Sequence, residues 1–195
     1  GAAFSGDGKL LLSPSGSSLK LFGAGTAESV GTLEGHADDI TCVAPHPKEP
    51  GQVFTASKDG TIRLWDYHAS TCLKTIHVRE VVRSMVFCED LPVAFLSINW
   101  NDGNSGRVIS FDWETGRAGR SAMKLSGPRQ LVCAGGGSAR TFAATFDRHS
   151  LFVWRAAAEI SHPLTLHHTK PFTCAAISGD ESMLAAGDAS GRIQV

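Results

Sequence analysis

The sequence lacks an excess of charge of either sign, a long apolar run and a paired-cysteine motif. Its 195 residues carry 18 Lys and Arg against 19 Asp and Glu, whereas a freestanding nucleic-acid-binding domain is usually strongly basic. No apolar run approaches the ~18–20 residues that a membrane-spanning helix needs. The five cysteines form no Cys-x-x-Cys motif and no Asn-x-Ser/Thr site occurs, which argues against a secreted disulfide scaffold. With 42% hydrophobic residues, we expect a soluble, intracellular chain that buries a core.

Internal repetition is the main feature that is present. Four segments with alternating apolar residues end in an aromatic residue, and these aromatic positions are 43, 46 and 43 residues apart. A fifth segment ends one residue before its aromatic position, which would lie 42 residues after Trp154. These segments are residues 18–22 (SLKLF), 61–65 (TIRLW), 107–111 (RVISF), 150–154 (SLFVW) and 192–195 (RIQV). A second register, starting at Thr41, Ser84, Leu131 and Thr173, has steps of 43, 47 and 42. A period of ~40–45 residues is typical of a β-propeller blade.

Each period is expected to hold four short antiparallel strands. In the second period these are residues 40–44, 52–56, 61–66 and 72–77, separated by turns rich in Pro, Gly, Asp and Ser. The only helical candidate, RAAAE at 155–159, is too short to stand alone. The predicted fold is all-β, with about four and a half blades at residues 1–35, 36–78, 79–126, 127–170 and 171–195. Because two open edges would invite aggregation, we expect the chain to be part of a larger propeller.

The second repeat contains Gly35-His36, the turn SKDGT at 57–61 and Trp65-Asp66. With these residues it resembles the full motif of the WD-repeat family. The other repeats depart from it: no other Gly-His pair occurs, Phe replaces Trp in two of them, and Arg155 follows Trp in another. WD-repeat propellers most often close with seven blades, so a seven-bladed or double propeller is expected.

The resemblance implies a structural hydrogen-bonded chain of His36, Ser57, Asp59 and Trp65. In it Asp59 orients His36, His36 bonds Ser57, and Ser57 reaches the indole N–H of Trp65. Such a satisfied network rigidifies a blade and is not itself catalytic. The alternative, a hydrolase triad, is disfavoured because no Gly-x-Ser-x-Gly elbow occurs and Ser57 and Asp59 share one hairpin turn. No catalytic residue is therefore expected.

Two further groups of residues suggest ligand sites only weakly. Residues 135–138 (GGGS) lack the lysine and the following helix of a phosphate-binding loop, so a turn is expected. The densest histidine group contains two adjacent members, which point to opposite faces of a strand and cannot share a metal. Its members are His162, His167 and His168. The cysteines near blade starts are expected to be small buried packing residues; they are Cys42, Cys133 and Cys174. No metal or cofactor is expected.

One local excess of basic residues falls on the predicted outer strand of the third blade and the loop after it. It consists of Arg117, Arg120, Lys124 and Arg129. Positive charge on an edge strand is a normal defence against edge pairing, and we favour this interpretation. The alternative is a docking stripe for RNA phosphate or an acidic partner. No aromatic residue interleaves the charges, as a single-strand binding platform would need.

Longer segments are similar to WD-repeat subunits of the small-subunit processome. They are GTLEGH at 31–36, DGTIRLWDY at 59–67 with LKTI at 73–76, and FTCA at 172–175 with GRI at 191–193. The resemblance implies a non-catalytic nucleolar scaffold in ribosome biogenesis, assembled on the 5′ external transcribed spacer of pre-rRNA for pre-18S rRNA processing and extending to rDNA transcription. Its partners would be other WD-repeat proteins of a large complex, with pre-rRNA and U3 snoRNP as candidate contacts, and neither membrane nor small-molecule substrate.

Fold alone does not identify a partner, so two alternatives stay open. The first is another WD-repeat adaptor, either a ubiquitin-ligase substrate receptor or a signalling scaffold. The second is an enzyme built on a propeller, which requires acidic or metal-binding residues repeated at the central channel. The sequence shows no such repetition.

Overall fold

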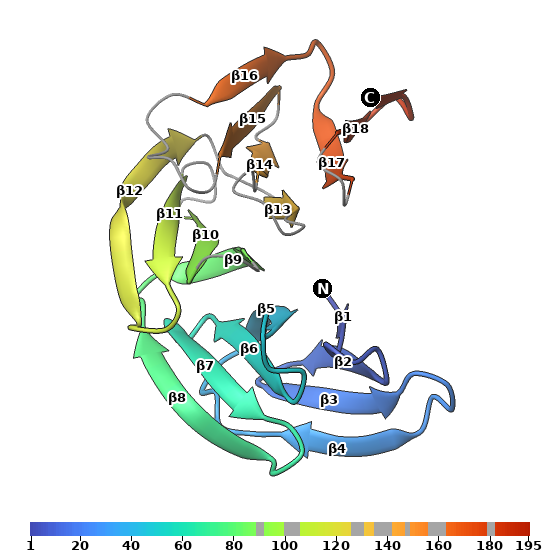
Figure 1. Ribbon diagram of the computed structural model, residues 1–195, viewed down its shortest axis with the longest axis vertical. Helices are drawn as coiled ribbons and strands as arrows, with labels where there is room; N and C mark the ends of the chain where they lie inside the picture. The colour runs from blue at the N-terminus through green and yellow to red at the C-terminus, as the bar shows by residue number, and fades with distance from the viewer. Residues whose placement is uncertain are drawn as a thin grey trace. The chain divides into compact units, whose positions relative to one another are not determined.

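The structure, a computed structural model, describes residues 1–88, 92–99, 106–125, 131–134, 142–146, 149–155, 163–178 and 182–195. Every regular element in these ranges is a β-strand (Figure 1). No helix among these residues is long and apolar enough to cross a membrane. The chain divides into two compact units, Gly1–Met85 and Val86–Val195.

The first unit contains two antiparallel sheets whose four strands follow one another in chain order (Figure 1). The first sheet consists of β1 (Ala3–Phe4), β2 (Leu10–Ser15), β3 (Ser18–Gly23) and β4 (Ser29–Leu33). The second consists of β5 (Ile40–Pro45), β6 (Gln52–Ser57), β7 (Thr61–Asp66) and β8 (Thr71–His77). The strands expected in the second repeat agree with β5–β8 to within one residue at each end.

Three further sheets follow the same strand order. The third begins with β9 (Val81–Phe87) and continues through β10 (Val93–Asn99), β11 (Gly106–Asp112) and β12 (Arg117–Leu125). The fourth consists of β13 (Leu131–Ala134), β14 (Phe142–Phe146), β15 (Ser150–Arg155) and β16 (Leu164–His167). The fifth has three described strands, β17 (Phe172–Ile177), β18 (Leu184–Asp188) and β19 (Ile193–Gln194). The turn expected at 135–138 lies outside the described residues.

Alternation along the strands gives the second sheet two buried faces. One face packs against the first sheet in a cluster formed by Leu12, Leu19, Leu21, Leu33, Ile40, Val53, Trp65 and Tyr67. The opposite face buries Cys42, Ala44, Phe54, Ala56 and Ile62. β6 (QVFTAS) lies between these two faces, and all of its residues except Gln52 are buried, including the hydroxyl residues Thr55 and Ser57.

The second unit has hydrophobic clusters of its own. One consists of Cys88, Phe95, Val108, Leu125 and Trp154, and another of Leu151, Phe172, Ala175 and Ala186. The rings of Phe95 and Trp154 meet edge to face, with centroids 5.3 Å apart. A four-stranded antiparallel sheet thus recurs along the chain, and the fold is an all-β, partial propeller.

Candidate functional site: a polar network in the second sheet

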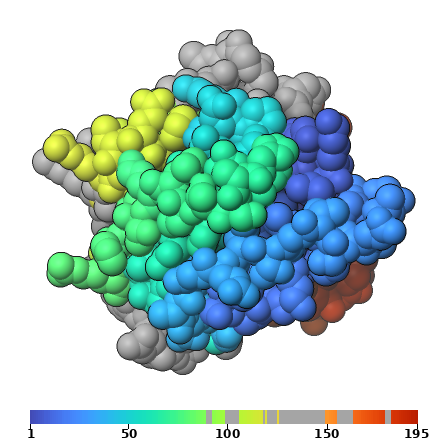
Figure 2. All heavy atoms as spheres, turned by 90° about the horizontal axis from the view of Figure 1, so that it is seen from below, coloured from blue at the N-terminus to red at the C-terminus, as the bar shows by residue number. Residues whose placement is uncertain are grey.

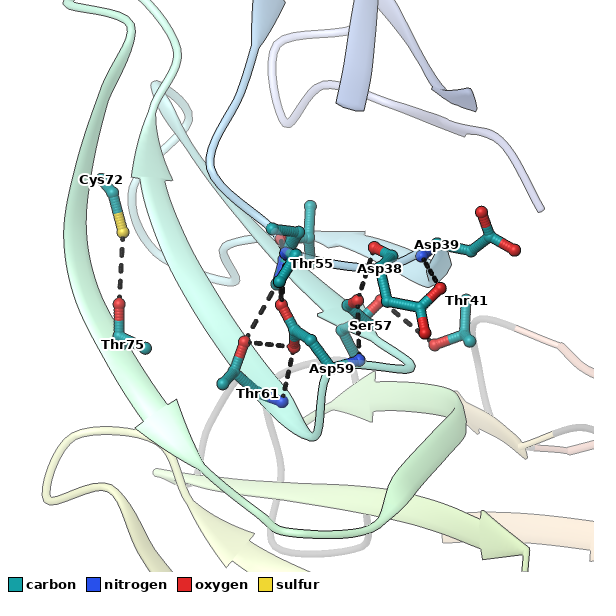
Figure 3. A network of polar contacts seen from close by, with 12 residues as sticks. Asp38, Asp39, Thr41, Thr55, Ser57, Asp59, Thr61, Cys72 and Thr75 are labelled. Carbon is teal, nitrogen blue, oxygen red and sulfur yellow. Dashed lines mark hydrogen bonds and ion pairs between the residues drawn. The ribbon is translucent and has the colours of Figure 1, made fainter. Parts of the chain in front are cut away.

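The turn between β6 and β7 carries the carboxylate of a buried polar network (Figure 3). Oδ1 of Asp59 accepts hydrogen bonds from the Thr61 backbone N–H at 2.8 Å and the Thr61 hydroxyl at 2.6 Å. Oδ2 accepts from the Ala37 N–H at 3.0 Å and lies 2.8 Å from Nδ1 of His36. Burial raises the pKa of Asp59, but these hydrogen bonds outweigh it and lower the pKa to about 2. Asp59 is therefore ionised at neutral pH, with both oxygens occupied.

The ring of His36 connects this carboxylate to β6. Its Nε2 lies 2.7 Å from the Thr55 hydroxyl, which lies 2.8 Å from Nε1 of Trp65. An indole N–H can only donate, so Thr55 accepts from Trp65 and donates its own hydrogen to His36. Nε2 of His36 is then unprotonated, and Nδ1–H donates to Asp59. The four side chains form one directed chain of hydrogen bonds.

The protonation state of His36 agrees with its surroundings. Burial lowers the pKa of His36, and the hydrogen bond and charge of Asp59 only partly oppose this effect. The side chain is fully buried. A neutral, enclosed imidazole whose two nitrogens are both occupied has no position for a substrate, so the arrangement stabilises the sheet.

Thr55 provides the hydroxyl between His36 and Trp65, and the expectation that Ser57 does so is wrong. In the β6–β7 ladder Trp65 pairs directly with Val53. Thr55 is therefore the diagonal neighbour of Trp65 on the same face of the sheet, within reach of the indole. Ser57 lies two residues further along β6, another ~6–7 Å away. Its hydroxyl is therefore too distant from the Trp65 indole to accept a hydrogen bond from Nε1.

Ser57 holds the turn instead (Figure 3). Its hydroxyl donates to the Asp38 carbonyl at 2.8 Å and accepts the Asp59 backbone N–H at 3.1 Å. Beside it, Lys58 donates its backbone N–H to the Asp39 carbonyl at 2.9 Å and pairs its ammonium with the Asp39 carboxylate at 2.7 Å. These contacts tie the β6–β7 turn to the segment that follows His36.

Gly35 has two structural reasons to be a glycine. Its φ of +146° is a conformation that other residues rarely adopt. A Cβ at this position would lie 3.0 Å from Nη1 of Arg63 and 3.2 Å from the Trp65 ring. The Arg63 guanidinium carbon lies 5.8 Å from the centroid of the Trp65 ring, a cation–π contact. The Gly-His pair thus lets the chain pass closely over Trp65 while His36 turns inward.

The tryptophan of the fourth sheet is not part of such a chain. Nε1 of Trp154 is buried and has no hydrogen-bond partner among the described residues. In the third sheet Phe111 stands at the tryptophan position and is 1% exposed. These sheets rely on apolar packing at that position.

The fifth sheet contains a related histidine–carboxylate pair that the sequence analysis missed. Asp188 occupies the ladder position of Ser57, and His168 precedes β17 by four residues, as His36 precedes β5. Oδ1 of Asp188 accepts from the Ser190 N–H at 2.7 Å and the Ser190 hydroxyl at 2.6 Å. Oδ2 lies 3.9 Å from Nδ1 of His168. The spacing from histidine to strand was the available sequence signal.

The basic residues of the third repeat are placed only in part. β12 is an edge strand of the third sheet, and Arg117 at its start is exposed. Arg120 and Lys124 belong to the same strand, but their side chains and all of Arg129 lie outside the described part. The structure therefore decides neither the edge-defence nor the docking interpretation.

The histidines and cysteines form no metal site in the part of the chain that is described. His167 is 3.0 Å from the Ser150 hydroxyl through its Nδ1, while His162 is not described. Cys42 is buried, and burial raises the pKa of its thiol to about 12. Cys174 is exposed, so the expectation of a buried packing residue is wrong there, because nothing described covers its face of the fifth sheet.

Repeated four-stranded antiparallel sheets, together with a Gly-His pair whose histidine is linked through a hydroxyl to a tryptophan, define a WD-repeat β-propeller. A sequence profile of the WD repeat-containing protein 75 first beta-propeller matches residues 3–111, and one of the WD domain, G-beta repeat matches residues 160–195. The chain belongs to the family of the WD repeat-containing protein 75 first β-propeller. WD-repeat proteins are generally non-catalytic scaffolds that mediate protein–protein interactions.

Two of the similar proteins carry the name of this family, and a third has a different name. WD repeat-containing protein 75 of Xenopus laevis is 32% identical over 111 residues, which cover 56% of this chain and 13% of that protein. The Mus musculus protein is 26% identical over 215 residues, covering 100% of this chain and 25% of that protein. DDB1- and CUL4-associated factor 13 of Mus musculus is 37% identical over 60 residues, which cover 29% of this chain and 14% of that protein. The chain thus spans a quarter or less of the length of these relatives.

Proposed function

We propose that this chain is part of a non-catalytic scaffold in ribosome biogenesis, a WD-repeat subunit of the small-subunit processome. It would assemble in the nucleolus on the 5′ external transcribed spacer of pre-rRNA and support pre-18S rRNA processing, with a further role in rDNA transcription. The observation that carries this proposal is the family match over residues 3–111. The resemblance of the processome-like segments to the same group of proteins adds to it.

The second sheet supports the non-catalytic part of the proposal. The set formed by His36, Asp59 and Thr55 is closed, because the Thr55 hydroxyl already accepts from Trp65 and lies 2.7 Å from His36. A nucleophile must be free to attack and a base must reach its substrate, and neither condition holds here. The network therefore serves to fix the shape of a binding scaffold.

Protein subunits, including other WD-repeat proteins, are the partners we propose. U3 snoRNP and pre-rRNA are further contacts, for which the exposed Arg117 and its neighbours Arg120, Lys124 and Arg129 are the candidate residues. With a formal net charge of −1, the chain has no general attraction for RNA, so such a contact would be local.

A second candidate is an adaptor of another complex. The similarity to a protein named as DDB1- and CUL4-associated favours a ubiquitin-ligase substrate receptor over a signalling scaffold. That similarity extends over 60 residues, or 29% of the chain, which is the length of one to two repeats. It is therefore weaker support than the family match over residues 3–111.

Purification of the full-length protein from nuclear extract, with identification of bound proteins and RNA, tests the proposal. We expect U3 snoRNA, the pre-rRNA spacer and other WD-repeat subunits. Recovery of DDB1 and CUL4 without these RNAs would contradict the proposal and favour the adaptor.

Charge reversal tests the basic residues in the same purification. If the basic residues of β12 (Arg117, Arg120 and Lys124, here called the β12 stripe) contact RNA, the variant R117E/R120E/K124E should lower the yield of U3 snoRNA in a salt-dependent way. The matched control, K9E/K20E/K48E, reverses three exposed lysines of the first unit and leaves the yield unchanged. An equal yield from both triple variants would return the stripe to the edge-defence interpretation.

A further inference from the structure

Three polar groups surround Nδ1 of His168, in the segment between β16 and β17. The Lys170 backbone N–H and carbonyl oxygen both lie 3.1 Å from this nitrogen, and Oδ2 of Asp188 lies 3.9 Å from it. A ring nitrogen either carries a proton and donates, or has a lone pair and accepts. The unprotonated nitrogen therefore has one partner here, the Lys170 N–H, whereas the protonated nitrogen has two oxygens that can accept from it.

Oδ2 of Asp188 is buried and has no hydrogen-bond partner among the described residues. The other oxygen, Oδ1, accepts from Ser190 and from the Arg192 backbone N–H at 3.1 Å. The hydrogen bond from the Ser190 hydroxyl lowers the pKa of Asp188, so the carboxylate is ionised at neutral pH. The Asp188 side chain is 3% exposed. A buried carboxylate oxygen without a donor is unfavourable, and a cation beside it would offset this cost.

Among the described residues, no donor keeps Nε2 of His168 unprotonated. In the second sheet, Thr55 donates its hydroxyl hydrogen to Nε2 of His36, which keeps that ring neutral. The β5–β6 and β17–β18 ladders correspond residue by residue, because both have a register shift after their first pair. Ala186 stands at the position of Thr55 and has no hydroxyl. The His168 side chain is also 20% exposed, so water can reach it, whereas the His36 side chain is fully buried.

The other charged or titratable side chains described next to His168 and Asp188 are exposed. They are His149, His167, Lys170 and Arg192. The His149 carbonyl accepts the His168 backbone N–H at 2.8 Å, which holds the backbone of His168 in place. Because solvent and salt screen exposed charges, Asp188 is the charge with the strongest effect on the His168 ring.

We propose that His168 and Asp188 form a proton-operated latch between the β16–β17 segment and the end of β18. When His168 takes up a proton from solvent, Nδ1 can no longer accept the Lys170 N–H and donates to Oδ2 of Asp188 instead. Their separation then closes from 3.9 Å to the ~2.7–2.9 Å of a charge-assisted hydrogen bond. Acidification therefore strengthens the fifth sheet, whereas it weakens the second. This property does not depend on the complex in which the scaffold works.

Hydrogen exchange of the full-length protein at pH 7.5 and 5.5, expressed as protection factors, tests the latch. On acidification the β17 and β18 amides are expected to gain protection about threefold to tenfold, because the ion pair exists only in the folded sheet. The Lys170 amide should lose protection, because its acceptor is then protonated. The β6 and β7 amides of the same sample provide a comparison of opposite sign.

Substitutions assign the effect to the pair. H168N and D188N should each abolish the gain, and H168N/D188N should behave like either single variant, because the two side chains act as one unit. H77N is the matched control: His77 is exposed on β8, green in Figure 2, and its loss should leave the gain unchanged. If D188N does not fold the fifth sheet, H168N still provides the test, because an asparagine oxygen can accept the Lys170 N–H.

Three results would overturn the proposal. Unchanged or lower protection of β17 and β18 at pH 5.5 would show that protonation of His168 does not strengthen the sheet. The same gain in H168N as in the wild type would assign the effect to another group. Additive effects of H168N and D188N in the double variant would show that the two side chains act independently.

Discussion

At the scale of single residues, the second sheet owes its polar network to the two-residue period of a strand. Thr55 and Ser57 lie on one face of β6, and both are hydroxyl residues next to the same turn. The cross-strand pairing of Trp65 with Val53 determines which one meets the indole. A motif in the sequence identifies the participants, but the ladder register assigns their roles.

T55V is therefore expected to be more costly than S57A. Loss of the Thr55 hydroxyl leaves the Trp65 N–H and Nε2 of His36 buried without partners, which should lower the local opening free energy by about 2–4 kcal/mol. S57A should cost about 1 kcal/mol, and T55S should restore most of the loss. Hydrogen exchange of the β6 and β7 amides in the full-length protein measures all three.

His36 gives the second sheet a defined dependence on pH. Burial lowers the pKa of His36 below its ordinary value of 6.5, so the opened sheet takes up a proton more readily than the folded one. The opening free energy should therefore fall as the pH decreases below about 6.5. Asp59, with its pKa lowered to about 2 from 3.8, adds a loss only below about pH 4.

The same exchange measurement at pH 7.5 and 5.5 tests this dependence. Wild type is expected to lose protection on acidification, by at most about tenfold per pH unit for each histidine that takes up a proton on opening. H36N should lose less, and the difference isolates His36, because burial also lowers the pKa of His46 in both proteins. A wild-type protein that gains protection at pH 5.5 would instead indicate a protonated His36 paired with Asp59.

At the scale of elements, the connections between strands carry most of the special backbone geometry. The β6–β7 turn places Gly60 at a φ of +78°, and the segment between β4 and β5 places Gly35 at +146°. The first allows a tight hairpin, and the second allows a backbone to pass over Arg63 and Trp65. Both glycines were visible in the motif, but only the close contact explains the second.

G35A should therefore destabilise the entry to β5. The left-handed backbone and the 3.0 Å approach to Arg63 act together, and we expect a loss of about 1–3 kcal/mol in local opening free energy. G25A is the matched control, because a Cβ there meets nothing within 4 Å. Hydrogen exchange of residues 33–42 in the full-length protein compares the two, and equal effects would contradict the packing argument.

At the scale of the whole molecule, repetition does not mean that the repeats are equivalent. The second sheet has a complete polar chain, the fourth leaves Trp154 without a described partner, and the fifth replaces the turn carboxylate with Asp188 two residues earlier. A scaffold can accept such differences, because the burial of apolar side chains between sheets stabilises the fold without the polar chain. Its surfaces and loops then remain free to bind partners.

The sequence by itself determined the all-β class, the period, the strands of the second repeat and the participation of His36, Asp59 and Trp65, because strand alternation and turn chemistry are local properties. Only the tertiary structure decided that Thr55 bridges His36 and Trp65, that Asp188 faces His168, and that Cys42 is buried while Cys174 is exposed. These features depend on ladder register and on what lies against each face of a sheet. Such contacts join residues distant in sequence, so a local pattern alone does not determine them.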